Sequence, residues 1–234
     1  MGQDLKIMAD EQKQKISVGI IMDGNRRWAK EKGLSTFEGH KKGYEKIKEL
    51  LGWCEKLPIS ALTMYAFSKE NWKREASEVG YLMDLIRLMI KTDMDDIVGK
   101  CLVKFIGDRE DLPDDLKPAV EVLEQKSEKA GGKFLFQIAL SYSGRDEIIR
   151  AIKKIENPGQ ITEQKFSDLL DTAGIPDPDI IIRTSGENRL SGFLTWQSVY
   201  SELFFIKTYW PDFSESDLSD ILRQYYERKR RFGK

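Results

Sequence analysis

The most informative stretch of this chain is Ile20-Ile21-Met22-Asp23-Gly24-Asn25-Arg26-Arg27-Trp28-Ala29. The apolar run 18–22 predicts a buried strand, Asp-Gly-Asn is typical of a turn, and the arginines and tryptophan after it begin a helical pattern. Backbone N–H groups at a helix start attract anions, arginine binds phosphate through paired donors, and aspartate suits Mg²⁺. This corner therefore fits a diphosphate with a divalent cation, whereas a solvated Asp-Gly hairpin turn is the plainer alternative.

Composition narrows the class of protein. The chain has 234 residues, 40% of them hydrophobic, and its 38 basic and 39 acidic residues give a net charge of −1. That balance argues against a nucleic-acid binder, which usually shows a basic excess. The single histidine, His40, excludes histidine-rich zinc sites, and Cys54 and Cys101 are expected to be buried thiols in a reducing compartment.

The first 16 residues form a polar extension that does not resemble a signal peptide, and no apolar run reaches the length of a membrane span. We therefore expect a cytoplasmic protein.

Apolar strand patterns alternate with helical patterns along the rest of the chain, which predicts a mainly parallel sheet covered by helices on both faces. We interpret 17–234 as one α/β domain with a central six-stranded, mostly parallel sheet. The expected strands are 18–22, 62–67, 102–106, 134–140, 180–182 and 203–206. The expected helices are 38–57, 76–98, 113–130, 144–156, 162–172, 191–200 and 214–231.

Polar clusters follow five of these strands, four of them with arginine, at the places where ligands bind to parallel sheets. They begin at Asp23, Ser68, Gly107, Ser141 and Arg183. We expect these clusters to converge on one rim of the sheet.

Two further segments are open to two interpretations each. The pattern over 77–98 is apolar on more than one side, which indicates either a fully buried helix or one that also lines an apolar ligand channel. The basic end, 228–234, is either a solvated helix terminus or an anion contact to a neighbouring subunit. Neither the Walker phosphate loop, the dinucleotide fingerprint nor an aspartate-rich DDxxD cluster occurs.

Taken together, the motifs of the chain resemble the cis-prenyltransferases, the undecaprenyl diphosphate synthase family, from residue 18 to residue 233. The first block is Asp23-Gly24-Asn25-x-Arg27-Trp28-Ala29, and the second is Tyr65-Ala66-Phe67-Ser68-x-Glu70-Asn71-Trp72-x-Arg74. Later blocks are Ile106-Gly107-Asp108, Tyr142-Ser143-Gly144-Arg145, Arg183-Thr184-Ser185-Gly186-Glu187-x-Arg189-Leu190-Ser191 and Trp210-Pro211-Asp212-Phe213.

The resemblance implies an enzyme that condenses isopentenyl diphosphate onto an allylic diphosphate of farnesyl or geranylgeranyl type. It implies Mg²⁺ as cofactor, cis double bonds in a polyprenyl diphosphate for glycosyl carrier lipid, and a hydrophobic tunnel beside the sheet. It also implies a homodimer, although a heteromer is known in the family, and membrane contact only through the lipid product. A short-chain synthase is the near alternative. A non-catalytic subunit is the remote one, because such subunits lose the Asp-Gly-Asn loop.

The resemblance also assigns roles to residues. Asp23 is expected to bind the metal and take part in catalysis, Glu202 to be a second metal ligand, and Asn71 to act near the transferred proton. Substrate contacts are expected from Gly24, Asn25, Arg26, Arg27, Trp28, His40, Phe67, Ser68, Lys69, Glu70, Trp72, Arg74, Arg183, Arg189, Leu190 and Ser191, and from Arg231 and Gly233 across the dimer.

Four positions depart from the family pattern. Arg26 stands where long-chain bacterial members have glycine, and Thr36 stands where many members have an arginine for the allylic diphosphate. Arg26 is therefore a candidate to replace that missing cation. Asn188 stands in place of a metal-binding histidine, and Gly192 in place of an asparagine.

Overall fold

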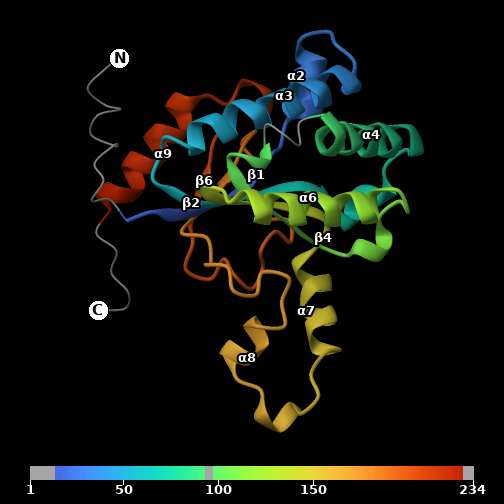
Figure 1. Ribbon diagram of the computed structural model, residues 1–234. Coiled ribbons are helices and arrows are strands. Elements are labelled where there is room, and N and C mark those ends of the chain that lie inside the picture. Colours follow the sequence, from blue (N-terminus) through green and yellow to red (C-terminus); the bar gives the residue numbers. More distant parts are fainter. Residues whose placement is uncertain (1–13, 93–96, 229–234) are drawn as a thin grey trace.

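The computed structural model describes residues 14–92 and 97–228, and these form one α/β unit around a six-stranded sheet (Figure 1). The strand order is β3-β4-β2-β1-β5-β6, and each of the five pairings is parallel. The strands are β1 (Ile16–Ile21), β2 (Ile59–Ser68), β3 (Cys101–Ile106), β4 (Phe134–Tyr142), β5 (Ile180–Arg183) and β6 (Glu202–Phe205). All six strands expected from the sequence are confirmed, with ends displaced by a few residues.

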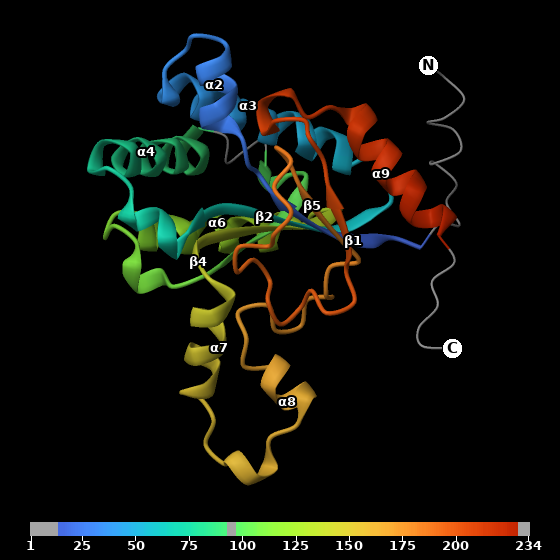
Figure 2. The ribbon, with the colours of Figure 1, turned by 180° about the vertical axis from the view of Figure 1, so that it is seen from behind.

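Helices α2 (Asn25–Glu31), α3 (Thr36–Cys54), α4 (Ala76–Thr92), α6 (Leu116–Ala130), α7 (Gly144–Ile152), α8 (Glu163–Ser167) and α9 (Glu215–Glu227) connect and cover the strands. Helices α3, α4 and α9 lie on one side of the sheet, and α7 and α8 extend from the other (Figures 1 and 2). Part of the predicted polar extension, 1–13, falls outside the described residues, as do 93–96 of the helix that the sequence predicts over 76–98.

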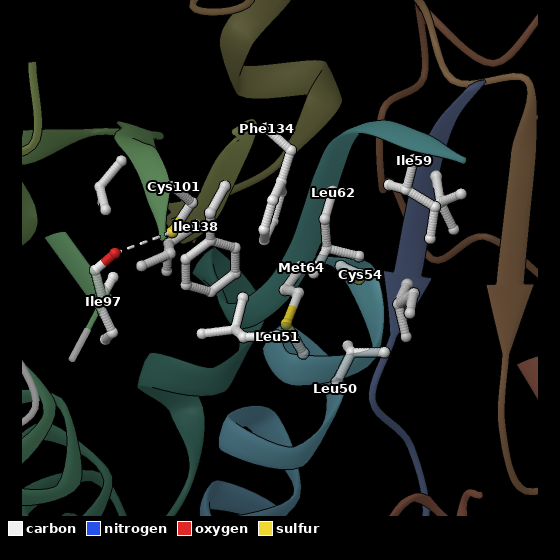
Figure 3. Close-up of a cluster of buried hydrophobic side chains, with 14 of the residues drawn as sticks. Leu50, Leu51, Cys54, Ile59, Leu62, Met64, Ile97, Cys101, Phe134 and Ile138 are labelled. Atoms are coloured by element: carbon white, nitrogen blue, oxygen red, sulfur yellow. Dashed lines mark hydrogen bonds between the residues drawn. The ribbon is translucent and has the colours of Figure 1, made fainter. Parts of the chain in front are cut away.

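Alternation along the strands explains the two covered faces. Val18, Leu62 and Phe136 belong to the large core beneath α3, α4 and α9, whereas their neighbours Ile21, Ala139 and Ile181 pack with Phe193 and Leu194 on the other face. Figure 3 shows α3 placing Leu50, Leu51 and Cys54 against β2 and β4. Both cysteines are buried and free, as expected.

One expected helix is wrong. Residues 191–200 form a series of turns, because Ser191, Gly192 and Leu194 have φ angles of 50°, 78° and 46°, which a right-handed helix does not allow. The apolar residues that suggested a helix are Phe193 and Leu194, and they fill the second face of the sheet instead.

No helix in the described ranges is both long enough and apolar enough to cross a membrane.

Gly107, directly after β3, allows the close packing of β3 against β4 to be tested. Gly107 has φ of 121°, and a Cβ there would lie 2.0 Å from the carbonyl oxygen of Leu140. We expect Gly107→Ala to lower the free energy of unfolding by about 3 kcal/mol or more, as measured by urea denaturation. Gly174→Ala is the control, because Gly174 has φ of 75° but open space around it, and backbone strain alone costs about 1–2 kcal/mol. Equal losses in the two variants would contradict the predicted clash.

Candidate active site

The strand order places a crevice between β1 and β5. The chain leaves β1 towards β2 on one side and leaves β5 towards β6 on the other, and ligands of parallel sheets bind where the direction reverses in this way. Ile21 lies level with Arg183 in the parallel register, so the turns that follow the two strands meet. The first and last polar clusters of the sequence are therefore side by side.

Asp23 is held from three directions at this crevice. Its N–H donates to the Thr184 hydroxyl at 2.9 Å, and that hydroxyl donates to the Asp23 carbonyl oxygen at 2.6 Å. The carboxylate accepts from Arg183 at 2.8 Å and lies 3.2 Å from the Arg27 guanidinium. Burial alone would raise the pKa of Asp23, but the hydrogen bond and charge of Arg183, and then of Arg27, hold that pKa below its usual value.

Arg183 is itself buried, with 5% of its surface exposed. Its guanidinium donates to the Ser191 hydroxyl at 2.8 Å and to the carbonyl oxygen of Arg189 at 2.5 Å, in addition to Asp23. The turn that contains Ser191 thus supplies two of the hydrogen-bond acceptors that the buried Arg183 guanidinium needs. The Arg189 side chain is exposed and pairs with Glu187, which also pairs with Arg27 at 3.1 Å.

A cavity of about 1360 Å³ lies above the carboxyl ends of β1, β2, β4 and β5. The expected convergence of the polar clusters on one rim therefore occurs for the first, second, fourth and fifth of them. The cavity lining includes six cationic side chains and two carboxylates, which gives it a strong excess of positive charge. The cations are Arg26, Arg27, Lys30, Arg74, Arg145 and Arg183, and the carboxylates are Asp23 and Glu70.

The Glu78 carboxylate contacts three side chains that line the cavity. Its carboxylate accepts from His40 at 3.1 Å and from Arg74 at 2.9 Å, and lies 3.8 Å from Arg26. Burial lowers the pKa of His40 in spite of its hydrogen bond to Glu78, so we treat this imidazole as neutral at pH 7. Arg26 is mostly exposed, and it lines the same cavity as Thr36.

An apolar pocket of about 80 Å³ adjoins the cavity between the sheet, α3 and α4. Met22, Asn25, His40, Ala66 and Leu82 line both hollows. Deeper in, the pocket is lined only by apolar and aromatic side chains and one glycine, namely Gly43, Tyr44, Ile47, Met64, Leu85, Ile86, Met89, Phe136, Ile138 and Trp210. The side chains of Leu85, Ile86 and Met89 on α4 thus line an apolar hollow, whereas a ligand channel beside this helix stays a prediction.

The predicted substrate residues fall into two groups. Twelve of the residues predicted for catalysis or binding line the cavity: Asp23, Gly24, Asn25, Arg26, Arg27, His40, Ser68, Glu70, Asn71, Arg74, Arg183 and Ser191. Trp28 and Phe67 are buried behind it, Lys69 and Trp72 bond to residues outside the lining, and Arg189 and Leu190 lie beside it. Arg231 and Gly233 lie outside the described residues.

The predicted metal ligands are separated within one chain. Glu202, at the start of β6, pairs in register with Ile180 at the start of β5. Arg183, which pairs in register with Ile21 at the end of β1, lies three residues further along β5. At about 3.3 Å per residue and about 4.8 Å per strand, that places Glu202 roughly 14 Å from the end of β1. Glu202 instead pairs with Arg228 at 2.7 Å. Within the part of the chain that the structure describes, no three acidic, histidine or cysteine side chains are grouped to hold a metal ion.

Twelve lining residues were absent from the predicted site, and Arg145 is the one among them that follows a strand and a glycine. Arg145 and Ser143 line the cavity at the start of α7, directly after β4. The same pattern that identified Arg26 and Arg27, namely arginine directly after a strand and a glycine, indicates Arg145 as well. Asn25 Oδ1 is buried and has no hydrogen-bond partner among the described residues, as expected of a group that contacts a bound ligand.

Comparisons with known proteins agree with this geometry. The prenyltransferase family model for undecaprenyl diphosphate synthase matches residues 21–233. An isoprenyl transferase of Agrobacterium fabrum is 45% identical, over 92% of this chain and 91% of its own length. A tritrans,polycis-undecaprenyl-diphosphate synthase (geranylgeranyl-diphosphate specific) of Thermoplasma volcanium is 43% identical, over 93% of this chain and 88% of its own.

A solved structure extends the likeness to three dimensions. Lavandulyl diphosphate synthase from Lavandula x intermedia, in complex with dimethylallyl diphosphate, superposes with a TM-score of 0.89 at 35% identity, over 93% of this chain and 98% of that one. The chain therefore belongs to the undecaprenyl diphosphate synthase family of prenyltransferases.

Proposed function

We propose that the protein condenses isopentenyl diphosphate onto an allylic prenyl diphosphate and repeats this step to make a Z-polyprenyl diphosphate for carrier lipid. The observation that carries the proposal is the cationic cavity that adjoins a narrow apolar pocket, with five lining residues in common. A prenyl diphosphate has the same division into a charged head and an apolar tail. The two hollows therefore match both parts of one substrate.

We assign the allylic diphosphate to the part of the cavity next to the apolar pocket. Asn25 and His40 line both hollows, and Arg26, Arg27 and Arg74 provide positive charge beside them. Arg26 supplies the cation that Thr36 does not, because both residues line this cavity. The isopentenyl diphosphate then lies toward Arg145, Arg183 and Ser191, with the predicted C-terminal arginine and glycine reaching it from a second copy.

Mg²⁺ fits this site through Asp23. Mg²⁺ commonly binds one or two protein carboxylates together with substrate phosphates and water, rather than a cage made by protein alone. Asp23 offers a partly exposed carboxylate on the cavity wall, although its two oxygens contact arginines. When bound, the ion would offset negative charge on the departing diphosphate. Glu202 of the same chain is too far away to share that ion, so a role for it would require a second copy.

The reaction places distinct demands on the protein. Breaking the allylic C–O bond leaves a carbocation and a diphosphate, whose charge the surrounding arginines stabilise. The isopentenyl double bond attacks this cation, and the proton lost from the adjacent carbon goes to an oxygen of diphosphate or water. Asn71 is a poor base, so we assign it to orienting that proton. The apolar pocket keeps water from the cation.

The Asp23 carboxylate can be tested directly. We expect Asp23→Ala to lower turnover by roughly 100- to 1,000-fold, because the metal loses the carboxylate that we propose as its ligand. The assay combines Mg²⁺, labelled isopentenyl diphosphate and a geranyl, farnesyl or geranylgeranyl primer. Asp212→Ala serves as the control, since Asp212 is exposed and lies outside the cavity lining. Near-normal turnover in folded Asp23→Ala would contradict the metal role.

Product length depends on the apolar pocket. Phe136 lines its deep part from β4, while the next residue back, Leu135, points to the opposite face of the sheet. The pocket volume of about 80 Å³ is the observation behind the second candidate function, a short-chain synthase, and the length of the products distinguishes it from the polyprenyl synthase proposed above. We expect Phe136→Ala to shift the products of the same primer to longer chains, as measured by chromatography of the dephosphorylated prenols. Leu135→Ala is expected to leave the distribution unchanged, and a shift of equal size there would contradict the assignment of the pocket.

We also propose that two copies associate through the edge of the sheet at β6. Val199, Tyr200 and Leu203 gather at that edge with 72%, 78% and 42% of their surfaces exposed. Exposed apolar groups on an edge strand are typical of an interface. We expect the predicted C-terminal residues Arg231 and Gly233 to reach the site from such a second copy. Membrane contact would then arise through the lipid product.

The association can be measured by light scattering after size-exclusion chromatography at several concentrations. We expect a dimer for the parent chain and at least a tenfold weaker association for Tyr200→Arg, because a buried charge without a partner is costly. Val122→Arg is the matched control, since Val122 is 44% exposed on α6, away from the β6 edge. A parent chain that is monomeric at all concentrations would contradict the proposal.

A further inference from the structure

The short 3₁₀ helix η1 (Lys69–Lys73) has three faces of different character. Residues three apart in a 3₁₀ helix lie on the same face. Asn71 and Arg74 therefore share one face, and both line the cavity. Lys69 and Trp72 share a second face, which is turned to the body of the protein. Lys73 lies on the third face and is exposed.

The Lys69 ammonium is held by three carboxylates from three places in the fold. It donates to Asp108 at 2.8 Å and to Asp146 at 2.9 Å, and it lies 3.2 Å from Asp111. Asp108 follows β3, Asp111 ends the 3₁₀ helix η2 (Arg109–Asp111), and Asp146 lies in the first turn of α7. A lysine ammonium has three donors, so these contacts account for all of them. Burial alone would lower the pKa of Lys69, but its hydrogen bonds to Asp108, Asp146 and Asp111 outweigh this effect and raise that pKa above its usual value.

Trp72 provides a second contact from the same face of η1. Its indole N–H donates to the Ser141 hydroxyl at 2.9 Å, and that hydroxyl donates to Asp111 at 2.7 Å. The two contacts of η1 therefore converge on Asp111. The ring of Trp72 also packs edge-on against Phe67, at a centroid distance of 4.8 Å.

The acidic residues that hold Lys69 are themselves fixed to the sheet. Arg150 donates to Asp146 at 2.8 Å and to Asp171 at 2.7 Å, and Asp171 accepts from the N–H of Gly107 at 3.0 Å. Exposed ion pairs are usually weak, but here the charges form a connected network and are only about a quarter exposed. Loss of Lys69 would leave three carboxylates close together without their shared cation.

We propose that Lys69 is a positioning residue, which fixes η1 to the frame of Asp108, Asp111 and Asp146 so that Asn71 and Arg74 face the cavity. The inference rests on the proposed function, because it takes Asn71 and Arg74 as the residues that act on substrate. It also replaces the direct substrate contact that the family resemblance suggested for Lys69.

The test compares three lysine variants. Lys69→Met keeps the length of the side chain without its charge, and we expect it to lower kcat by about 10- to 100-fold with a smaller change in KM, because misplacement of an acting group chiefly affects the chemical step. Lys69→Arg restores the charge and is expected to return kcat to within a few-fold of the parent. Lys73→Met, on the same helix, is expected to leave kcat unchanged. Amide hydrogen exchange over 69–74 is expected to rise only in Lys69→Met.

Asn71→Ala supplies the internal reference. If Lys69 acts through Asn71, the double variant Lys69→Met/Asn71→Ala has a kcat within about threefold of Asn71→Ala alone. Multiplied losses, or a normal kcat in folded Lys69→Met beside an impaired Asn71→Ala, would overturn the inference and leave the proposed function intact. Full activity in Asn71→Ala would instead count against the proposed function. If Lys69→Met does not fold, Asp111→Asn takes its place, and it must lower kcat while exchange over 69–74 rises.

Discussion

The site depends on the way in which Asp23 is fixed between β1 and β5. The Thr184 hydroxyl binds both the N–H and the carbonyl oxygen of Asp23, so the backbone of the turn has little freedom. Arg183 then sets the direction of the carboxylate at 2.8 Å. Because the parallel register places Ile21 level with Arg183, these contacts follow from the pairing of two central strands. The position of a candidate metal ligand is thus determined by the core of the sheet.

The excess positive charge of the cavity destabilises the folded protein, and the protein's own carboxylates offset only part of this repulsion. Six cations and two carboxylates face the same space, and like charges repel one another where water is partly excluded. Internal partners such as Glu78 and Glu187 relieve part of this repulsion, since each pairs with more than one cation. The remainder favours binding of an anion, and a ligand that binds only the folded state also stabilises it. Substrate recognition and folding stability are therefore coupled at this cavity.

The sequence was sufficient to predict the sheet and most of its helices, because long apolar runs and polar strand ends are local patterns. It failed at 191–200, where Phe193 and Leu194 pack on the second face of the sheet and Ser191 turns to meet the Arg183 guanidinium. Both contacts join residues to a distant strand, and no periodicity within the segment reports them. The separation of Glu202 from Asp23 was missed for the same reason, since it depends on the register of β5 with β6.

The direction of the side chains in η1 was also beyond the sequence. Five residues are too few to show a period, and the family resemblance treated Lys69, Glu70 and Trp72 alike as substrate contacts beside the catalytic Asn71. The 3₁₀ geometry divides them, because three residues per turn bring Lys69 above Trp72 and Asn71 above Arg74. An α-helical turn would instead bring Lys69 nearer to Lys73, and would offset it from Trp72 by about 60°, a sixth of a turn. The tighter helix thus allows one short segment to bind the frame with one face and present polar groups to the cavity with another.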